Sequence, residues 1–366
     1  MKLALFTIFR VPNYGSVLQT FATQYYLESL GHKCVFIDYY KKQTLKQKVK
    51  AFLSLYNIAC ILGVRPQFRK PRQLNRFIKR YINLSSRYEG LEALRKVDWT
   101  CFDALVVGSD QVWNARYHGK ENVYLLPFVD KNARCFSLAS SFAVNEIPGE
   151  YREYYGRELS KFNAISVREY NGVKIVASLE IGLEAKQILD PTLWLSGEEW
   201  QRLFNKTHSY NKPYILLYMW TYAFEPRPYI YEVVKYWKAQ LGDCDVIALE
   251  GSPKAKECGM KTKDVADSTI PEFMDYFANA SLVVTSSFHG TAFALNFERP
   301  LISIVPDVYG DDRQSSLLKL VGASTSIVHV NGPIESINPY YDTEVVSENL
   351  NKLREQSLNW INSSII

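Results

Sequence analysis

Short apolar runs alternate with helical segments along most of the chain, and this alternation is what most restricts the fold. The runs lie at residues 3–9, 34–38, 103–107, 135–139, 164–167, 214–218, 244–249, 282–285 and 301–305. The clearest helical periodicities lie at residues 15–30, 230–241 and 291–297. Strands that are apolar on both faces and are separated by helices are typical of parallel sheets covered by helices on both sides. We therefore predict an α/β fold made of doubly wound, Rossmann-like sheets.

The strand–helix pattern restarts in the second half of the chain, which indicates two domains. A length of 366 residues fits two domains of ~100–200 residues each. Turn residues at Asp190-Pro191 and at positions 211–213 separate the two halves. We predict domains at 1–195 and 196–366 with a central cleft, because ligands of such sheets bind beyond the carboxyl ends of the strands.

One segment of the first half is strongly basic. Between residues 41 and 87 there are thirteen Lys or Arg residues and no Asp or Glu, and residues 51–64 inside it are mostly apolar. This apolar stretch is shorter than the ~20 residues that span a bilayer. We predict a helical insertion at 41–88 and leave two interpretations open. It is either a subdomain with a solvated basic face or a surface helix that contacts an anionic membrane.

Composition excludes several classes of protein. A net charge of +5 and 22% charged residues are ordinary for a folded chain and give no indication of nucleic-acid binding. Six scattered cysteines without a CxxC pair predict reduced thiols in a cytoplasmic protein. The apolar start ends at Arg10 without a cleavage site, so we expect a buried strand and not a signal peptide. Neither HxxxH nor a carboxylate cluster occurs, so we predict no metal site and no cofactor.

The loop after the first predicted strand contains Asn13, Tyr14, Gly15 and Ser16 and precedes a helix. Free backbone N–H groups at a helix start favour an anion or a sugar hydroxyl, and glycine lets a ligand approach the backbone. The loop has neither the GxGxxG nor the GKS/T pattern, so we expect no dinucleotide or ATP there. The alternative is an ordinary helix cap by Asn13.

The loop after the strand at 103–107 combines polar and aromatic residues, namely Asp110, Gln111 and Trp113. An aromatic ring faces the C–H bonds of a sugar while polar groups bind its hydroxyls. The loop therefore predicts a sugar site. The alternative for Trp113 is a place in the core.

A third loop, with Ser286, Ser287, His289 and Gly290, joins the apolar strand at 282–285 to a helix. This position is typical of a phosphate-binding turn, and an imidazole there can donate a hydrogen bond or a proton to an anion. The alternative is a structural histidine.

Two arginines are candidate clamps for a carboxylate or phosphate. Arg168 ends the strand at 164–167, and Arg313 lies on the loop before the helix predicted at 315–322. For both, the alternative is a simple ion pair with a neighbouring acid.

These motifs together resemble the polysaccharide pyruvyl transferase family. The resemblance rests on NYGSVLQTFA (13–22), FDALVVGSDQVWN (102–114), AISVRE (164–169), LDPT (189–192), SSFHGTAFALNFERPLISI (286–304) and DRQSSLLKLVG (312–322). It implies a two-domain fold like that of GT-B glycosyltransferases, with the acceptor on the N-terminal domain and the donor on the C-terminal domain. It implies transfer of a pyruvyl group from phosphoenolpyruvate to a sugar of a cell-surface glycan or its lipid-linked precursor, at the inner face of the cytoplasmic membrane.

By position, the resemblance implies that His289 and Arg168 bind the donor or act in catalysis, and the chemistry that it implies suggests roles for the other candidates. His289 would be the acid and Asp110 the base; Arg168, Ser286, Ser287, Gly290 and Arg313 would bind the donor, and Asn13, Tyr14, Gly15, Gln111 and Trp113 the acceptor. Family members often have an arginine where this chain has Ser287. Two alternatives stay open. The first is a GT-B glycosyltransferase with a nucleotide-sugar donor, whose ribose would bind Glu250 in the Glu250-Gly251 loop. The second is a glycan-binding member without catalytic activity.

Overall fold

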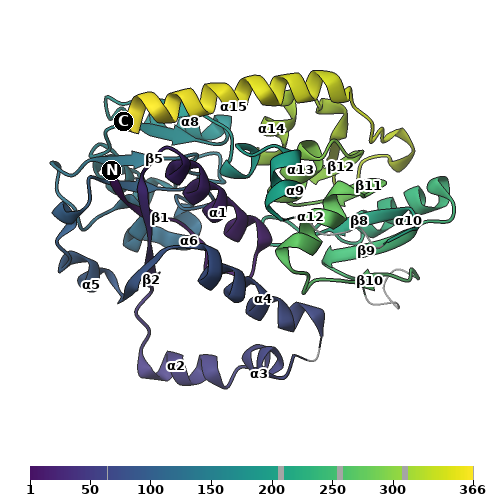
Figure 1. The fold of residues 1–366 in the computed structure, drawn as a ribbon, viewed down its shortest axis with the longest axis horizontal. Helices are drawn as coiled ribbons and strands as arrows, with labels where there is room; N and C mark the ends of the chain where they lie inside the picture. Colours follow the sequence, from purple (N-terminus) through teal and green to yellow (C-terminus); the bar gives the residue numbers. More distant parts are fainter. Residues whose placement is uncertain (64, 205–209, 254–258, 307–311, 366) are drawn as a thin grey trace. The chain divides into compact units, whose positions relative to one another are not determined.

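The computed structural model describes residues 1–63, 65–204, 210–253, 259–306 and 312–365. The chain forms two compact units (Figure 1). Unit 1 comprises Met1–Ile61, Asn75–Trp194 and Leu353–Ile366, and unit 2 comprises Leu62–Leu74 and Leu195–Lys352.

Unit 1 contains a five-stranded parallel sheet in the order β3-β2-β1-β4-β5. Its strands are β1 (Lys2–Phe6), β2 (Lys33–Tyr40), β3 (Leu84–Glu89), β4 (Ala104–Val107) and β5 (Cys135–Ser137). β6 (Ile165–Val167) and β7 (Ala185–Gln187) form a separate parallel pair. Single bridges from Phe136 to Ala164 and from Ser140 to Val167 join this pair to the sheet edge.

The helices of unit 1 connect the strands as the alternation predicts. They are α1 (Tyr14–Ser29), α2 (Leu45–Phe52), α3 (Leu55–Leu62), α4 (Pro66–Tyr81), α5 (Leu91–Arg95), α6 (Ala115–His118), α7 (Gly149–Leu159) and α8 (Tyr170–Ser178). α1 starts at Tyr14 because the side chain of Asn13 accepts hydrogen bonds from the N–H groups of Gly15 and Ser16. The last residue of α3 and the first half of α4 belong to unit 2.

Unit 2 repeats the architecture with a six-stranded parallel sheet in the order β10-β9-β8-β11-β12-β13. The strands are β8 (Tyr214–Tyr218), β9 (Asp245–Glu250), β10 (Lys263–Asp264), β11 (Leu282–Thr285), β12 (Leu301–Val305) and β13 (Ile327–His329). The helices are α9 (Gly197–Leu203), α10 (Tyr229–Leu241), α12 (Ile270–Ala278), α13 (Phe288–Asn296) and α14 (Arg313–Val321), and the long α15 (Thr343–Ile365) ends in unit 1. Two doubly wound parallel sheets are thus confirmed.

Aromatic residues fill the core of each unit. Trp113 is fully buried in unit 1 and packs on Phe142 with ring centroids 5.2 Å apart. In unit 2, Phe273 lies 4.8 Å from Phe277 and 5.2 Å from Phe293. Truncating one such ring to alanine typically costs ~3–5 kcal/mol, so these clusters hold the sheets and helices of each unit together.

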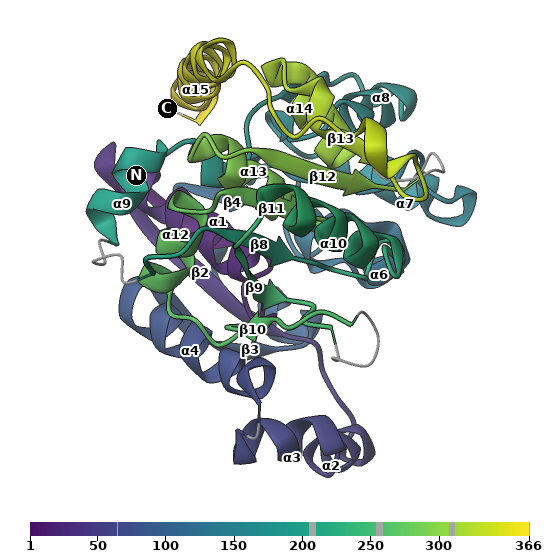
Figure 2. The ribbon, with the colours of Figure 1, turned by 90° about the vertical axis from the view of Figure 1, so that its right-hand side faces the viewer.

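The basic segment does not form one helical insertion at 41–88. Its last part is β3, which pairs with β2 and so belongs to the sheet of unit 1. Its middle part, Leu62–Leu74, makes its contacts in unit 2. α2 and α3 lie apart from the five-stranded sheet of unit 1 in both views of Figures 1 and 2. The sequence did not indicate β3, because most of its residues are polar and at most half-buried.

The sequence predicts a domain boundary between residues 195 and 196. In the structure, the chain passes from unit 1 to unit 2 between Trp194 and Leu195. Besides Leu62–Leu74, the C-terminal segment departs from the predicted division, since its residues from Leu353 onward contact unit 1. Cys34, Cys60, Cys101, Cys135 and Cys244 carry free thiols, and Cys258 lies outside the described residues. No described helix has the length and apolar character that a membrane span requires.

Candidate functional site

The two sheets place the predicted loops at their topological switch points. In unit 1 the chain runs from β1 toward β3 on one side and from β4 to β5 on the other, so β1 and β4 are neighbours whose loops diverge. In unit 2 the same relation holds for β8 and β11. Ligands of doubly wound sheets bind at such points. The loops with Asn13, Asp110 and His289 all follow strands at a switch point.

Asp110 is the centre of the polar cluster in unit 1. Its Oδ2 accepts a hydrogen bond of 2.5 Å from the hydroxyl of Ser16, and its Oδ1 accepts one of 2.9 Å from the N–H of Gln111. The backbone of Asp110 has φ 71°, in the left-handed region that a non-glycine residue rarely adopts. Such conformations are concentrated at functional sites. The loop therefore holds this carboxylate, 7% exposed, in one fixed position.

Arg168 lies behind Asp110 and not at the surface of unit 1. Its guanidinium bonds the Asp190 carboxylate at 2.7 Å and lies 3.6 Å from Asp110 Oδ1 and 3.9 Å from Glu169 Oε2. The hydroxyl of Ser109 also donates to Asp190, at 2.7 Å. The Arg168 side chain is 0% exposed. The guanidinium therefore supports the carboxylate of Asp110 from within, which differs from the surface clamp expected from the sequence.

The predicted acceptor residues separate into two groups. Tyr14 and Trp113 are both fully buried, and the Trp113 indole N–H donates to the Tyr124 carbonyl, so neither ring presents a face to a sugar. Asn13 caps α1, as the alternative interpretation has it, and Gly15 is one of its two donors. Gln111 is half-buried beside Asp110, and its side-chain oxygen accepts a hydrogen bond from Asn114.

Sequence reasoning missed His118, which closes α6 near Asp110. Burial lowers the pKa of His118 to about 4; the nearby Lys41 also lowers this pKa, while a hydrogen bond with the Gln111 backbone and the Asp110 carboxylate oppose the shift. The imidazole is therefore neutral at pH 7. No local pattern indicates this proximity, because it depends on how the chain folds between Asp110 and the end of α6.

The turn from Ser286 to Gly290 joins β11 to α13 in unit 2. The hydroxyl of Ser286 donates to the Trp220 carbonyl at 2.8 Å and accepts from the Trp220 N–H at 2.9 Å. Ser287 caps α13, because its hydroxyl accepts from the N–H of Gly290. A Cβ on Gly290 would overlap Thr285 Oγ1 and lie 2.9 Å from Tyr218. Glycine is thus required at 290 because the helix packs closely on the sheet, a reason the sequence did not show.

The two predicted basic groups of unit 2 are both buried. His289 is the second residue of α13, 5% exposed, with its ring edge-on to Phe288 at 5.3 Å. Arg313 begins α14 after β12, 3% exposed, and donates to the Tyr222 hydroxyl at 3.3 Å. Because β11 and β12 are neighbours, both residues stand at the carboxyl edge of the same sheet.

A further cation at this edge comes from α4 and was not singled out from the sequence. Lys70 is 2% exposed, forms a short ion pair with Glu250 at the end of β9, and lies 4.7 Å from the centroid of the Trp220 ring. Burial lowers the pKa of Lys70 and raises that of Glu250, and the charge of each partner opposes the shift of the other. Within the described ranges, no group of three or more His, Cys, Asp or Glu residues is placed to hold a metal ion.

Solved structures of known proteins share this fold. The chain is similar to a putative UDP-N-acetylglucosamine 2-epimerase from Listeria monocytogenes, with 10% identity, a TM-score of 0.58, and 100% of this chain and 91% of the other covered. It is also similar to the UDP-GlcNAc 2-epimerase of Methanocaldococcus jannaschii, with 14% identity and a TM-score of 0.55, and the match covers 96% of this chain and 99% of the other. The S. aureus MnaA-UDP co-structure matches with 12% identity and a TM-score of 0.52, and the match covers 100% of this chain and 98% of the other. These neighbours have GT-B-type folds, so the predicted GT-B-like class is confirmed.

Comparison at the level of sequence gives a family. A search of curated proteins finds no match to the chain. The family model described as polysaccharide pyruvyl transferase, however, matches residues 13–308, which include every predicted site loop up to β12. The chain therefore belongs to the polysaccharide pyruvyl transferase family.

Proposed function

We propose that this protein transfers a pyruvyl group from phosphoenolpyruvate to two hydroxyls of a sugar, forming a cyclic ketal on a cell-surface polysaccharide or its lipid-linked precursor. One observation carries the proposal. In a chain of this family, a fixed carboxylate, Asp110, follows a strand at one switch point, and an imidazole, His289, follows a strand at the other. We infer that both groups act in one reaction.

The chemistry needs one acid and one base. His289 protonates the methylene carbon of phosphoenolpyruvate, and the adjacent carbon becomes electrophilic. The first sugar hydroxyl attacks that carbon and gives its proton to Asp110. The C–O bond to phosphate then breaks, and the second hydroxyl attacks the same carbon. The products are the ketal and inorganic phosphate, and the phosphate takes the proton of the second hydroxyl.

Donor binding needs positive charge, because phosphoenolpyruvate carries a phosphate and a carboxylate. We propose Arg313 and the backbone of the turn at Ser286, Ser287 and Gly290 as the donor site. The two serine hydroxyls and the N–H groups of Ser287 and Gly290 already form hydrogen bonds within unit 2, so an anion bound at the turn would replace some of these bonds. Arg168 contributes through Asp110, which it supports.

Nucleotide-sugar transfer is the less favoured alternative. It assigns Glu250 to the ribose of the donor. That carboxylate is already engaged in an ion pair with the buried Lys70, so a ribose would have to displace an ammonium group. Breaking a buried ion pair leaves an uncompensated charge, which costs several kcal/mol, about 3–5 in typical cases.

We further propose a cytoplasmic protein that contacts the inner face of an anionic membrane through α2 and α3. Leu45, Leu53 and Ile61 in and between these helices are 78%, 62% and 57% exposed. Lys46 and Lys50 on α2 are exposed as well. Apolar side chains with basic neighbours and no acidic ones are typical of segments that lie on anionic lipid.

The decisive experiment incubates the full chain with phosphoenolpyruvate and candidate glycan acceptors. A mass gain of one pyruvyl ketal per acceptor, with one phosphate released, supports the proposal. His289→Ala should lower turnover by ~10²–10⁴, and so should Asp110→Asn. Stabilisation of the protein by UDP or GDP but not by phosphoenolpyruvate would instead favour nucleotide-sugar transfer. Binding of glycan with no ketal under any condition would favour a member without catalytic activity.

A further inference from the structure

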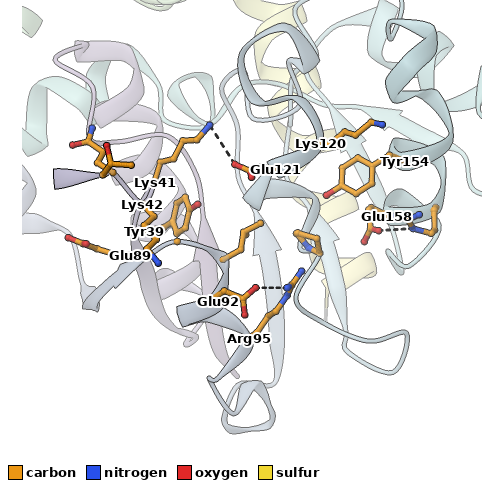
Figure 3. Close-up of a pocket in the computed structure, with 16 residues that line it drawn as sticks. Tyr39, Lys41, Lys42, Glu89, Glu92, Arg95, Lys120, Glu121, Tyr154 and Glu158 are labelled. Carbon is orange, nitrogen blue, oxygen red and sulfur yellow. Dashed lines mark hydrogen bonds and ion pairs between the residues drawn. The ribbon is translucent and has the colours of Figure 1, made fainter. Parts of the chain in front are cut away.

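Unit 1 contains a cavity of about 640 Å³ to which the reaction above assigns no role (Figure 3). It lies where β2 and β3 end, so it opens at the same carboxyl edge of the sheet as the loop of Asp110. The chain segments that line it are residues 39–44, 89–95 and 120–127 together with part of α7. This volume is in the range of small-ligand sites, ~300–1,000 Å³.

Two tyrosines give the cavity its aromatic surface. Tyr39 and Tyr154 lie on opposite sides and direct their hydroxyls toward its middle (Figure 3). Burial raises the pKa of Tyr154 to about 12, and it also raises the pKa of Tyr39. Both phenols are therefore protonated at neutral pH and can donate a hydrogen bond. Neither hydroxyl bonds to another residue in the part of the chain that the structure describes.

Charged side chains of both signs surround the tyrosines, five basic and four acidic. Three of the basic groups have acidic partners: Arg95 with Glu92, Arg157 with Glu158, and Lys41 with Glu121 at 3.8 Å. Lys42 and Lys120 make no ion pair with any described residue. The stem of Lys42 rests on Gly90, where an added Cβ would come within 3.1 Å of it. The cavity thus has acceptors, donors and two ammonium groups without a counter-charge.

This combination selects a chemical class of ligand. Aromatic rings beside groups that donate and accept hydrogen bonds suit the C–H faces and hydroxyls of a sugar. Two unpaired ammonium groups favour an anionic substituent on that sugar. A nucleic acid is disfavoured by the four carboxylates, and an apolar ligand by a lining in which only Leu91 and Pro127 are aliphatic.

The cavity is linked to the Asp110 loop through one short segment. Asp110 begins this segment, and Lys120 and Glu121 at its far end line the cavity. His118, between them, is close enough to respond to both Asp110 and the cavity residue Lys41. A glycan whose reacting unit is at Asp110 can therefore extend along this edge of the sheet.

We propose that the cavity is a second saccharide subsite, which binds a carboxylate- or phosphate-bearing sugar of the acceptor while the unit to be modified lies at Asp110. This inference rests on the proposed function, because it assumes a glycan acceptor. Lys42 and Lys120 bind the anionic group, and Tyr39 and Tyr154 bind the sugar ring and its hydroxyls.

Binding without phosphoenolpyruvate tests the subsite separately from turnover. We would titrate the full chain with trigalacturonate, with its methyl ester as a neutral match, and with galactose 1-phosphate, by calorimetry. Wild type should bind at least one anionic probe about tenfold more tightly than the ester. Tighter binding of trigalacturonate identifies the carboxylate as the source of charge, and tighter binding of galactose 1-phosphate identifies the phosphate.

The double variant Lys42→Ala/Lys120→Ala should lose about tenfold in affinity for the anionic probe. Lys131→Ala/Lys186→Ala is the matched control, because these exposed lysines lie in unit 1 away from the cavity, and it should bind as wild type does. Binding of both anionic probes no tighter than that of the ester, or unchanged binding by the Lys42/Lys120 variant, would overturn the proposal. If the subsite binds as expected and no acceptor is pyruvylated, the proposed function fails and the subsite does not.

Discussion

The hydroxyl of Ser16 donates a 2.5 Å hydrogen bond to the carboxylate of Asp110, which joins the loop after β1 to the loop after β4. The two residues are 94 positions apart in the chain. They meet because β1 and β4 are adjacent parallel strands with their carboxyl ends at one edge. This contact fixes the carboxylate that we propose as the base.

Removing the Ser16 hydroxyl should therefore lower both the turnover and the stability of the protein. In Ser16→Ala, one oxygen of a mostly buried carboxylate loses its donor, and we expect a loss of ~1–3 kcal/mol in unfolding free energy. The kcat of pyruvyl transfer should fall about tenfold, while the KM for phosphoenolpyruvate stays within about twofold. Steady-state kinetics measure kcat and KM, and urea unfolding measures the change in unfolding free energy. Ser29→Ala, whose hydroxyl bonds within the exposed end of α1, is the control. A kcat equal to wild type would show that the contact does not orient the base.

Replacing Arg168 should reveal whether it supports Asp110 or binds the donor. Arg168→Met leaves Asp190 and Asp110 without their buried cation, and we expect a loss of about 3–5 kcal/mol. Arg168→Lys keeps the charge but not the planar fork, so it should restore part of that stability. The exposed pair of Arg95 and Glu92 supplies the control, since Arg95→Met should change stability by less than ~1 kcal/mol. Arg168→Met with wild-type stability and a raised KM for phosphoenolpyruvate would favour the donor role instead.

Gly290 should tolerate no side chain. The methyl group of Gly290→Ala would overlap Thr285 Oγ1 and press on Tyr218, so α13 must shift away from the sheet. Overpacking of this kind typically costs ~1–3 kcal/mol and more where backbone must move. Gly149→Ala is the matched control, because a Cβ there meets nothing within 4 Å, and its effect should stay within ~0.5 kcal/mol. Thermal unfolding of the two variants side by side is sufficient. Equal melting temperatures would contradict the close packing at 290.

Stability should fall in mild acid in part because of His118. Its pKa is lowered to about 4 in the folded protein, from an ordinary value of 6.5. The unfolded chain therefore binds the proton more readily between these values, and the contribution is present above pH 6.5 and lost as the pH falls toward 4. We expect His118→Gln to reduce the loss of unfolding free energy over this window by about 1–3 kcal/mol. Urea unfolding at several pH values measures it, and parallel pH profiles of variant and wild type would refute the assignment.

How much of this could be read from the sequence depends on whether a feature is local. The bounds of β8, β11 and β12 match the apolar runs at 214–218, 282–285 and 301–305, because each strand is buried along its whole length. The edge strands β3 and β10 were missed because they are mostly polar and partly exposed. β7 and β13 were missed as well, and each is only three residues long.

In the candidate site too, only local features could be predicted. The positions of its loops follow from the strand–helix alternation, since each loop comes directly after a buried strand. The contacts that these loops make could not be predicted. The ion pair between Lys70 and Glu250 joins residues 180 positions apart, and no local pattern marks one lysine among thirteen basic residues as the buried one. Similarly, GSDQVWN indicates a polar turn, but only packing against Phe142 places Trp113 in the core.

The last prediction concerns α2, α3 and the turn between them, which expose several apolar side chains. If they insert into lipid, Leu53→Glu/Ile61→Glu should lower binding to anionic vesicles at least tenfold, because it removes apolar contact and adds repulsion. Co-sedimentation with phosphatidylcholine vesicles, with and without about 30% phosphatidylglycerol, measures this. Tyr340→Glu/Val345→Glu changes two residues of unit 2 that are 56% and 44% exposed, and it should bind as wild type does. Binding should also weaken with salt, because basic groups such as Lys46 and Lys50 attract the lipid surface. Equal recovery with neutral and anionic vesicles, or no effect of the two glutamates, would show that this apolar surface contacts something other than a membrane.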